Sequence, residues 1–446
     1  LAPSNLAIMQ SSGLTISAKV AAERAVNLLL SGPAGGLAAA LAIGHQTHQP
    51  RLMTFDMGGT STDVALLEGE IRLTNQGKIA SYPVAVPMAD IHTIGAGGGS
   101  IAFVDAGGLL QVGPASAGAH PGPACYGRGG TAPTVTDANL VLGRLRSDAF
   151  LGGRMQLDKS AAASALQPLA DQLQISVTEL AFGIIRIANE SMIQALRVIS
   201  IQQGHDPRDF RLMSFGGAGG LHICDLADAL DVTDAIVPLN SGVLSALGML
   251  AAQPGRELVK THQGILHQLH DEALTAELNA LLTIAQRELK DEGIIHTQHQ
   301  YHLDLRYLGQ TFSIAIAYHD ITTAIADFHA MHSRLYGHAL DKAVELVNLR
   351  VHVEAVRPPF TLPTSLAVNA TQQHREAVYG AIVGEANPVP IYRRDMLADA
   401  CLLTGPALIT EDHTTVFLKS GWLASKDELG NLKLTRSVSV TGDSPT

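Results

Sequence analysis

Residues 55–63 have the sequence Phe-Asp-Met-Gly-Gly-Thr-Ser-Thr-Asp, and this stretch decides the expected fold. The apolar residues before it predict a strand that ends at Asp56, and Asp63 begins a second strand. The two glycines between them allow a tight turn whose backbone N–H groups can approach a ligand closely. We therefore expect a β-hairpin with an anion-binding turn.

This turn differs from a Walker loop, because no Gly-Lys-Ser/Thr follows the glycines and the next predicted element is a strand. The donors expected to hold phosphate oxygens are the N–H and hydroxyl groups of Gly58, Gly59, Thr60 and Ser61. The carboxylates of Asp56 and Asp63 would repel phosphate, so we expect them to hold hydrated Mg²⁺ or to orient a water molecule. The alternative is a capped surface hairpin without a ligand.

A second glycine-rich turn, Ser-Phe-Gly-Gly-Ala-Gly-Gly at residues 214–220, joins a predicted strand to a helix expected from Leu221. Its functional interpretation is a floor for adenosine or phosphate at the helix N-terminus, formed by Gly216, Gly217 and Gly219. The alternative is a tight strand–helix turn. A dinucleotide site is not expected, since no Gly-x-Gly-x-x-Gly with an acidic residue at Rossmann spacing occurs.

A third glycine-rich segment extends from Gly95 to Gly130, where twelve of the 36 residues are glycine. Just before this block, His92 is a candidate acid/base, since imidazole titrates near working pH. Two alternatives use the same region. One is a metal site formed by Asp90, His92, His120 and Cys125, and the other is a Cys125 nucleophile with His120 as its base. Asp137 is expected to be the N-cap of a helix that runs to about residue 145.

Composition limits the function classes. A chain of 446 residues with 46% hydrophobic residues predicts two or three well-buried domains. The formal net charge of −11, without a basic run, argues against nucleic acid as a partner. Three scattered cysteines favour the cytoplasm. The most apolar stretch, residues 28–44, is too interrupted by Ser31, Pro33 and glycines to span a bilayer. The chain begins at Leu1 rather than Met, which favours a fragment of a longer protein.

Periodicity along the chain predicts three regions, with boundaries near 255 and 358. Region 1–255 is an α/β unit that includes a long helix over 178–203, closed by Gly204, and a βαβ unit over 210–238. Region 256–358 is an α+β unit with helices over 272–292 and 322–336. Region 359–446 is a β-rich C-terminal domain.

Taken together, the motifs resemble the hydantoinase A/5-oxoprolinase family. The resemblance rests on FDMGGTSTDV, HTIGAGGGSIAFVDAGGLLQVGPASAGAHPGPACYGRGG, TVTDANLVLGRL and FGGAGGLH, with SGPAGG, LRYLGQ, VELVNLRV and GPALITEDHTTVFLKSGW in the same order. It extends from about residue 8 to about residue 436. The family's earlier DTGGT-type loop, in an amino-terminal domain, has no match in this chain, so we expect the chain alone to bind nucleotide weakly.

The resemblance implies an actin-like ATPase core of the RNase H-like, sugar kinase/Hsp70/actin superfamily. It implies ATP and Mg²⁺ as cofactors, with Asp56, Gly58, Gly59, Thr60 and Asp63 at the second phosphate loop. The glycine-rich block, with His92 and Ser100, is expected to face the substrate or the partner. The implied activity is ATP-dependent ring opening of a cyclic amide, by phosphorylation of its oxygen, in an oligomer with a B-type subunit or domain.

The sequence does not choose among hydantoin, N-methylhydantoin and 5-oxoproline as substrates. Two other functions stay open. One is a subunit like that of acetone carboxylase, which would phosphorylate an enolate. The other is a non-catalytic, actin-like scaffold that responds to nucleotide.

Overall fold

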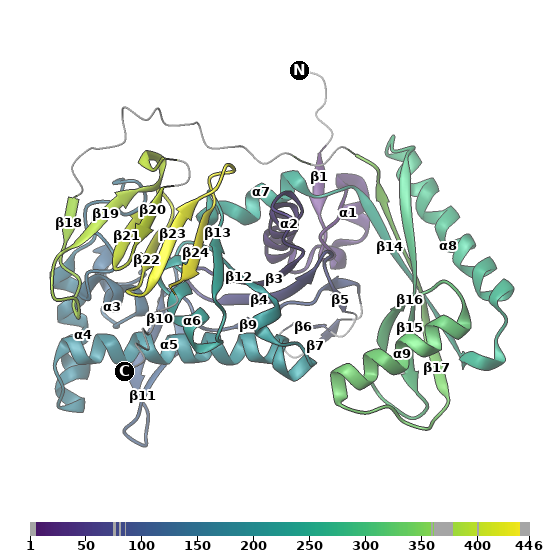
Figure 1. Ribbon diagram of the computed structural model, residues 1–446, viewed down its shortest axis with the longest axis horizontal. Helices are drawn as coiled ribbons and strands as arrows, with labels where there is room; N and C mark the ends of the chain where they lie inside the picture. The colour runs from purple at the N-terminus through teal and green to yellow at the C-terminus, as the bar shows by residue number, and fades with distance from the viewer. Residues whose placement is uncertain are drawn as a thin grey trace, which may run out of the picture.

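An eight-stranded mixed sheet forms the centre of the computed structural model, which describes residues 6–74, 77–79, 82–84, 86–357, 360, 378–398 and 401–437 (Figure 1). In spatial order its strands are β20 (Leu402–Thr404), β23 (Trp422–Lys426), β24 (Leu432–Arg436), β13 (Asp234–Val237), β12 (Arg211–Phe215), β3 (Arg51–Met57), β4 (Thr62–Glu68) and β9 (His92–Ile94). Strand β12 is parallel to both β3 and β13, and the other neighbours are antiparallel.

Alternating residues of the central strands enter two different cores, one on each face of the sheet. On β3, for example, Leu52 packs with the helices α2 (Ser31–Gln46) and α7 (Leu244–Ala251). Met53 and Phe55 face the other core, which contains α3 (Val135–Val141), α4 (Lys159–Leu173), α5 (Val177–Ile199) and α6 (Ile223–Ala229). The sheet is thus a middle layer between two layers of helices.

Helix α5 shows how local sequence sets helix ends. Ser176 is its N-cap and forms a capping box with Glu179, as the Ser-x-x-Glu pattern favours. The helix was expected to continue to residue 203 but ends at Ile199, and a short 3-10 turn over Ile201–Gln203 leads to Gly204. Gly204 has φ 74°, the left-handed conformation that glycine adopts at helix ends.

Asp137 is not the N-cap that the sequence suggested. Thr134 is the N-cap of α3, and Asp137 is the third helical residue, which closes the capping box from the other side. The fully buried Asp137 carboxylate also accepts hydrogen bonds from the backbone N–H groups of Ala124 (3.3 Å) and Cys125 (2.8 Å). It therefore ties the glycine-rich block to the start of α3.

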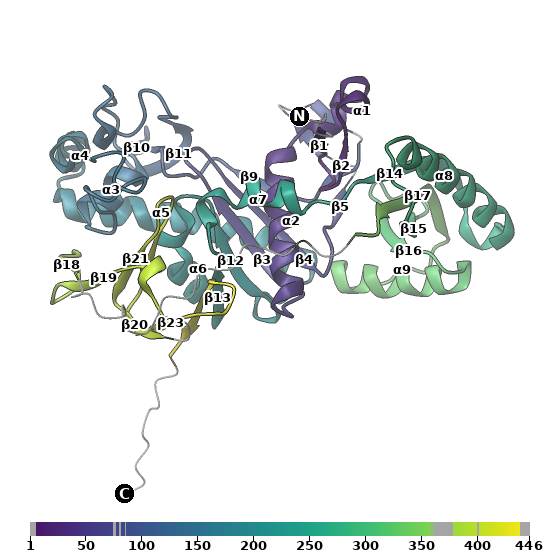
Figure 2. The same cartoon turned by 90° about the horizontal axis from the view of Figure 1, so that it is seen from above.

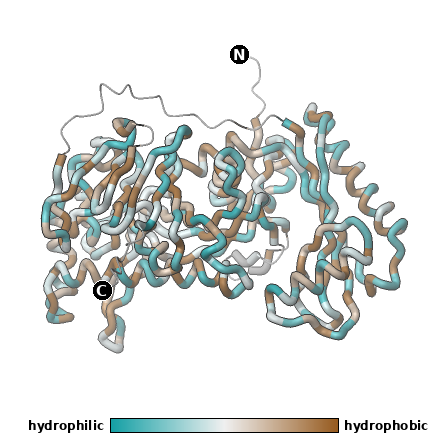
Figure 3. Tube along the Cα trace, viewed as in Figure 1, coloured by the Kyte–Doolittle hydropathy of each residue, from teal (hydrophilic) through white to brown (hydrophobic). Residues whose placement is uncertain are grey.

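Residues 255–355 form a second sheet with its own hydrophobic core (Figure 2). Its strands, in spatial order, are β14 (Gly255–Ile265), β17 (Val344–Ala355), β15 (Thr297–Tyr307) and β16 (Ile314–Ala317). The helices α8 (Asp271–Asp291) and α9 (Ile321–Tyr336) share that core and lie close to the expected ranges. Along α8 hydrophobic and hydrophilic residues alternate (Figure 3), because one side of the helix is buried.

In the region expected to be a β-rich C-terminal domain, 359–446, the described strands join the first unit. Strands β20, β23 and β24 extend the central sheet, and β24 pairs with β13 from Asp234↔Thr435 to Val237↔Leu432. Beside them lies a four-stranded sheet of β18 (Val378–Gly380), β19 (Val389–Arg393), β21 (Ala407–Thr410) and β22 (Thr415–Leu418). Its buried residues belong to the same core as α5, so this region completes the first unit.

The remaining strands and the remaining α-helix are short. They are β1 (Ala7–Met9), β2 (Thr15–Ser17), α1 (Ala18–Glu23), β5 (Leu73–Thr74), β6 (Gly77–Ile79), β7 (Tyr82–Val84), β8 (Met88–Ala89), β10 (Ser100–Val104) and β11 (Leu110–Ser116). Among the described residues, no helix combines the length and the apolar character needed to cross a bilayer.

Candidate functional site

The turn between β3 and β4 has the hairpin geometry that the sequence predicted. Asp56 and Asp63 lie directly opposite each other in the register, and the Gly58 N–H closes the turn on the Ser61 carbonyl at 3.1 Å. Paired residues of an antiparallel ladder project to the same face. The two carboxylates therefore flank the base of one turn.

The outer side of this turn carries donors that have no partner among the residues described. Within the described chain, no hydrogen bond involves the N–H groups of Gly59, Thr60 and Ser61 or the hydroxyls of Thr60 and Ser61. A Cβ built on Gly59 would meet no atom within 4 Å, so the space above the turn is open. Successive free N–H groups in a turn form a concave site for an anion such as phosphate.

The two carboxylates are held in place and resist ionisation. Burial and the neighbouring Asp63 raise the pKa of Asp56 to about 6, against a hydrogen bond from the Ser245 hydroxyl at 3.3 Å. Burial also raises the pKa of Asp63, whose Oδ1 accepts a 2.5 Å hydrogen bond from the Thr93 hydroxyl. Neither hydroxyl was among the predicted site residues, although Thr93 directly follows His92 at the start of the third glycine-rich segment.

The second glycine-rich turn lies directly against the first. Gly216 has φ 80°, and a Cβ there would lie 2.3 Å from Asp56 Oδ1 and 2.4 Å from the Met57 carbonyl oxygen. The Ala218 N–H donates to that same carbonyl at 3.1 Å. Only glycine fits such contact, so the two glycine-rich turns predicted from sequence lie directly against each other. The helix expected from Leu221 begins at Ile223 and has seven residues.

The third glycine-rich segment also contacts the first turn. The N–H groups of Gly98 and Gly99 donate to the carbonyls of Gly58 (3.0 Å) and Gly59 (2.6 Å). A Cβ on Gly97 would lie 2.7 Å from the Ser61 nitrogen. The block as a whole was expected to face a substrate or a partner, and residues 97–99 within it pack against the turn.

Ser100 likewise has a local role. It is fully buried, and its hydroxyl accepts from the Gly97 N–H at 2.8 Å and donates to the Gly95 carbonyl at 3.3 Å. These bonds fix the conformation of the glycine-rich segment. The expectation that Ser100 faces a substrate is therefore not consistent with the structure.

His92 lies on β9, opposite Val64, whereas its neighbour Thr93 lies opposite Asp63. Side chains alternate between the faces of a strand, so His92 projects to the face opposite the one that carries Asp63 and the Thr93 hydroxyl. The structure therefore does not bring the predicted acid/base to the two carboxylates.

The alternatives around Cys125 are not supported. Its side chain is fully buried while His120 is exposed, and burial and the Asp137 carboxylate raise the pKa of the thiol far above its usual range. Such a thiol stays protonated and is a poor nucleophile. No group of three His, Cys, Asp or Glu side chains in the described ranges is placed to hold a metal ion, so Asp90, His92, His120 and Cys125 do not form a metal site.

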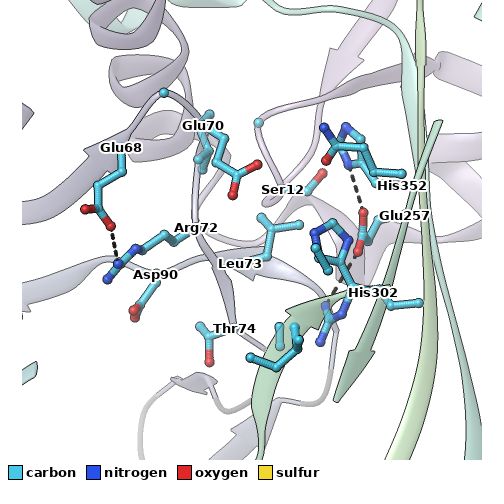
Figure 4. Close-up of a pocket in the computed structure, with 18 of the residues that line it drawn as sticks. Ser12, Glu68, Glu70, Arg72, Leu73, Thr74, Asp90, Glu257, His302 and His352 are labelled. Atoms are coloured by element: carbon cyan, nitrogen blue, oxygen red, sulfur yellow. Dashed lines mark hydrogen bonds and ion pairs between the residues drawn. The ribbon is translucent and has the colours of Figure 1, made fainter. Parts of the chain in front are cut away.

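A large cavity of about 1660 Å³ lies at the opposite end of β4, between the two units (Figure 4). One wall carries Glu68 and Arg72, joined at 2.5 Å, and the other carries the second sheet's polar face. On that face His352 pairs with Glu257 at 2.9 Å. Burial opposes the charge of His352, but its hydrogen bonds to Glu257 and Glu354 outweigh burial and raise its pKa to about 10. The described lining residues do not include the turn at 58–61.

Fold and site together define an α/β protein whose central sheet carries a glycine-rich hairpin turn flanked by two carboxylates. Residues 2–257 match the Hydantoinase/oxoprolinase family model, so the chain belongs to the hydantoinase/oxoprolinase family. It is 37% identical to caprolactamase subunit alpha of Pseudomonas jessenii over 96% of the chain and 64% of that protein. It is 34% identical to 5-oxoprolinase PfmaA of Pestalotiopsis fici over 88% of the chain and 32% of that protein.

Two solved structures share the fold. The ATP-dependent caprolactamase of Pseudomonas jessenii superposes with a TM-score of 0.84 and 34% identity, over 96% of this chain and 65% of that one. Acetone carboxylase in its nucleotide-free structure gives a TM-score of 0.75 and 26% identity, over 97% of this chain and 64% of that one. The chain thus spans less than two thirds of the length of each of these relatives.

Proposed function

We propose that this chain is the nucleotide-binding, A-type component of an ATP-dependent enzyme that opens cyclic amides. The observation that carries the proposal is the turn at 58–61, whose free donors lie beside two half-buried carboxylates. Membership in the hydantoinase/oxoprolinase family supports it, as does the similarity to a caprolactamase and a 5-oxoprolinase.

The turn and its carboxylates fit magnesium-bound ATP. The N–H groups of residues 59–61 and two hydroxyls would hold phosphate oxygens, since each donor lacks a partner in the described chain. Asp56 and Asp63 would hold Mg²⁺ directly or through water, because carboxylate oxygens are its preferred protein ligands. Their raised pKa values support this assignment, since a divalent cation would remove the repulsion between two adjacent negative charges.

The second glycine-rich turn would form the floor of the same site. We propose that Gly216, Gly217 and Gly219 receive the adenosine or a phosphate, since Gly216 lies so near Asp56 that a Cβ would be 2.3 Å from its Oδ1, and Gly217 is exposed. The sheet supports an actin-like core, because the antiparallel strands β9, β4 and β3 are followed by β12 and β13 in parallel. We leave His92 out of the proposed site.

An unstrained amide is a poor electrophile, so opening it needs an activated oxygen. Bound ATP would supply the phosphoryl group that turns the amide oxygen into a leaving group. This chain's own part is to hold the phosphates on the N–H face of the turn and to keep the two carboxylates fixed through Ser245 and Thr93. A B-type subunit or domain would complete ring opening, consistent with the subunit name of the caprolactamase relative.

Activation of a ketone enolate for carboxylation is a second candidate, favoured by the structural likeness to acetone carboxylase. The two functions differ in their requirement for bicarbonate. Turnover that requires bicarbonate and a ketone favours the carboxylase, whereas ADP release stimulated by caprolactam, hydantoin or 5-oxoproline favours the amide hydrolase.

The decisive experiment measures Mg-ADP binding by calorimetry and amide-stimulated ADP release in the complete protein with its B-type partner. Asp63→Ala should weaken binding about tenfold or more, roughly 1.4 kcal/mol. Asp148→Ala, which removes an exposed carboxylate paired with Arg146, is the matched control and should bind normally. Equal binding by Asp63→Ala and the unmodified protein would exclude the proposed nucleotide site. ADP release that no cyclic amide stimulates would exclude the proposed reaction.

A further inference from the structure

The turn at 58–61 and the preceding Met57 have hydrogen-bonded carbonyls on one side, whereas the N–H groups of residues 59–61 have no partner among the described residues. The carbonyls of Met57, Gly58, Gly59 and Ser61 accept from the N–H groups of Ala218 (3.1 Å), Gly98 (3.0 Å), Gly99 (2.6 Å) and Gly58 (3.1 Å), in that order. A carbonyl oxygen that turned outward would repel an anion, since both carry negative charge. These bonds therefore determine which face of the turn can bind phosphate.

Gly98 connects this arrangement to the start of α3. Its N–H donates to the Gly58 carbonyl, and its own carbonyl accepts both the N–H (2.7 Å) and the hydroxyl (2.8 Å) of Thr136. Thr136 is 8% exposed, and a Cβ on Gly98 would lie 2.9 Å from its hydroxyl oxygen. Thr136 thus fixes a glycine that has no side chain to fix its own position.

The next residue anchors Thr136 in turn. The Asp137 carboxylate accepts from the N–H of Cys125 (2.8 Å) and from the N–H (3.0 Å) and hydroxyl (2.7 Å) of Thr134. This position is part of a helix that packs on α4 and α5. The first turn of α3 is therefore connected to the turn at 58–61 by hydrogen bonds from Thr136 to Gly98 and from Gly98 to Gly58.

We propose that Thr136 is a positioning residue for the phosphate-binding turn. Through Gly98 it keeps the Gly58 carbonyl behind the turn, so that the N–H groups of residues 59–61 converge on an anion. The identity of the anion rests on the proposed nucleotide-binding function, whereas the hydrogen bonds from Thr136 through Gly98 to Gly58 are present in the chain itself. A purely structural role for Thr136 would instead change stability and leave affinity unchanged.

Three variants of the complete protein separate these roles. Thr136→Val keeps the side-chain shape and the backbone N–H that satisfies the Gly98 carbonyl, but it removes the hydroxyl donor. Thr136→Ser restores that donor. Thr54→Val is the matched control, since it removes another buried hydroxyl bond, from Thr54 to the Ala65 carbonyl (3.2 Å), within the same hairpin.

Two readouts are compared, the amide hydrogen exchange of Gly98 and Gly99 by NMR and the affinity for Mg-ADP by calorimetry. Thr136→Val should speed exchange at both glycines and weaken binding about three- to tenfold, the effect of one neutral hydrogen bond. Thr136→Ser should behave as the unmodified protein, and Thr54→Val should change neither readout.

Unchanged exchange in Thr136→Val would overturn the proposal, and so would an equal loss of affinity in Thr54→Val. If no form binds Mg-ADP but exchange at Gly98 rises only in Thr136→Val, the positioning role stands and the proposed nucleotide function fails. The two conclusions are thus decided separately.

Discussion

Replacing Gly59 with alanine isolates the ligand-binding face of the turn. A Cβ at Gly59 would meet no protein atom within 4 Å, and the backbone there is outside the left-handed region, so the folded protein accommodates the methyl group. We expect the free energy of unfolding to change by less than about 0.5 kcal/mol. The methyl group would, however, enter the open space beside the turn, where we propose that the phosphate binds.

The expected loss is in nucleotide affinity. A hydrogen bond to a charged group contributes about 1.5–3 kcal/mol, so displacing one phosphate oxygen should weaken Mg-ADP binding by roughly 10- to 150-fold. Calorimetric titration gives the affinity, and thermal unfolding without nucleotide gives the stability. Gly32→Ala is the matched control, because its Cβ also meets nothing within 4 Å but lies in α2.

Gly97→Ala, unlike Gly59→Ala, is expected to lower the stability of the folded protein as well as its affinity for nucleotide. Its Cβ would lie 2.7 Å from the Ser61 nitrogen and 2.8 Å from the Gly59 carbonyl carbon, so two backbone segments must move apart. We expect a loss of about 1–3 kcal/mol of stability together with weaker binding. Unchanged Mg-ADP affinity in Gly59→Ala would refute the assignment of this face to phosphate, whatever Gly97→Ala does.

Three further predictions concern ionisable side chains. The pKa of Asp56 is raised in the folded state, so ionisation of this carboxyl destabilises the protein as the pH rises from about 4 through about 6. In the absence of metal, Asp56→Asn should therefore raise the melting temperature at about pH 7.5 but leave it unchanged at about pH 4. The pKa of His352 is raised to about 10, so protonated His352 stabilises the fold fully below about pH 6.5, and this stabilisation is lost as the pH rises through 10. Urea unfolding should give His352→Gln a lower free energy of unfolding than the unmodified protein at about pH 6, and the difference should disappear above about pH 10. In Asp137→Asn the buried N–H groups that donate to the carboxylate would face a side-chain amide that itself carries N–H donors. We expect the free energy of unfolding, measured with a chemical denaturant, to fall by about 3 kcal/mol or more. Unchanged stability in this variant would contradict the role of Asp137 as an anchor.

The glycine-rich turns were predictable because glycine density is a local signal. The turns at 58–61 and 216–220 both lie where the pattern of strand, glycines and next element placed them. The helices α8 and α9 were also predicted within a few residues, since their apolar periodicity is strong. These features depend on near neighbours in the chain.

Other features depend on distant pairings that no local pattern contains. The sequence showed β24 as a strand but not its partner β13, about two hundred residues earlier, so the C-terminal region was assigned to a separate domain. Ser245 and Thr93 hold the carboxylates through single hydroxyls, and each hydroxyl lies 30 or more residues along the chain from its carboxylate. Thr136 belongs to a motif of the family, but its hydrogen bond to the Gly98 carbonyl joins residues 38 positions apart and was not predictable from the local sequence.

The pairing of β13 with β24 has a consequence for biosynthesis. During translation β13 is complete long before the ribosome reaches residues 432–436, so the growing sheet has an open edge while about two hundred residues are added. An unpaired strand edge is a template for association with other chains. A nascent chain stalled before β23 and β24 should therefore aggregate or recruit chaperones, whereas release of the last strands closes that edge from within the same molecule.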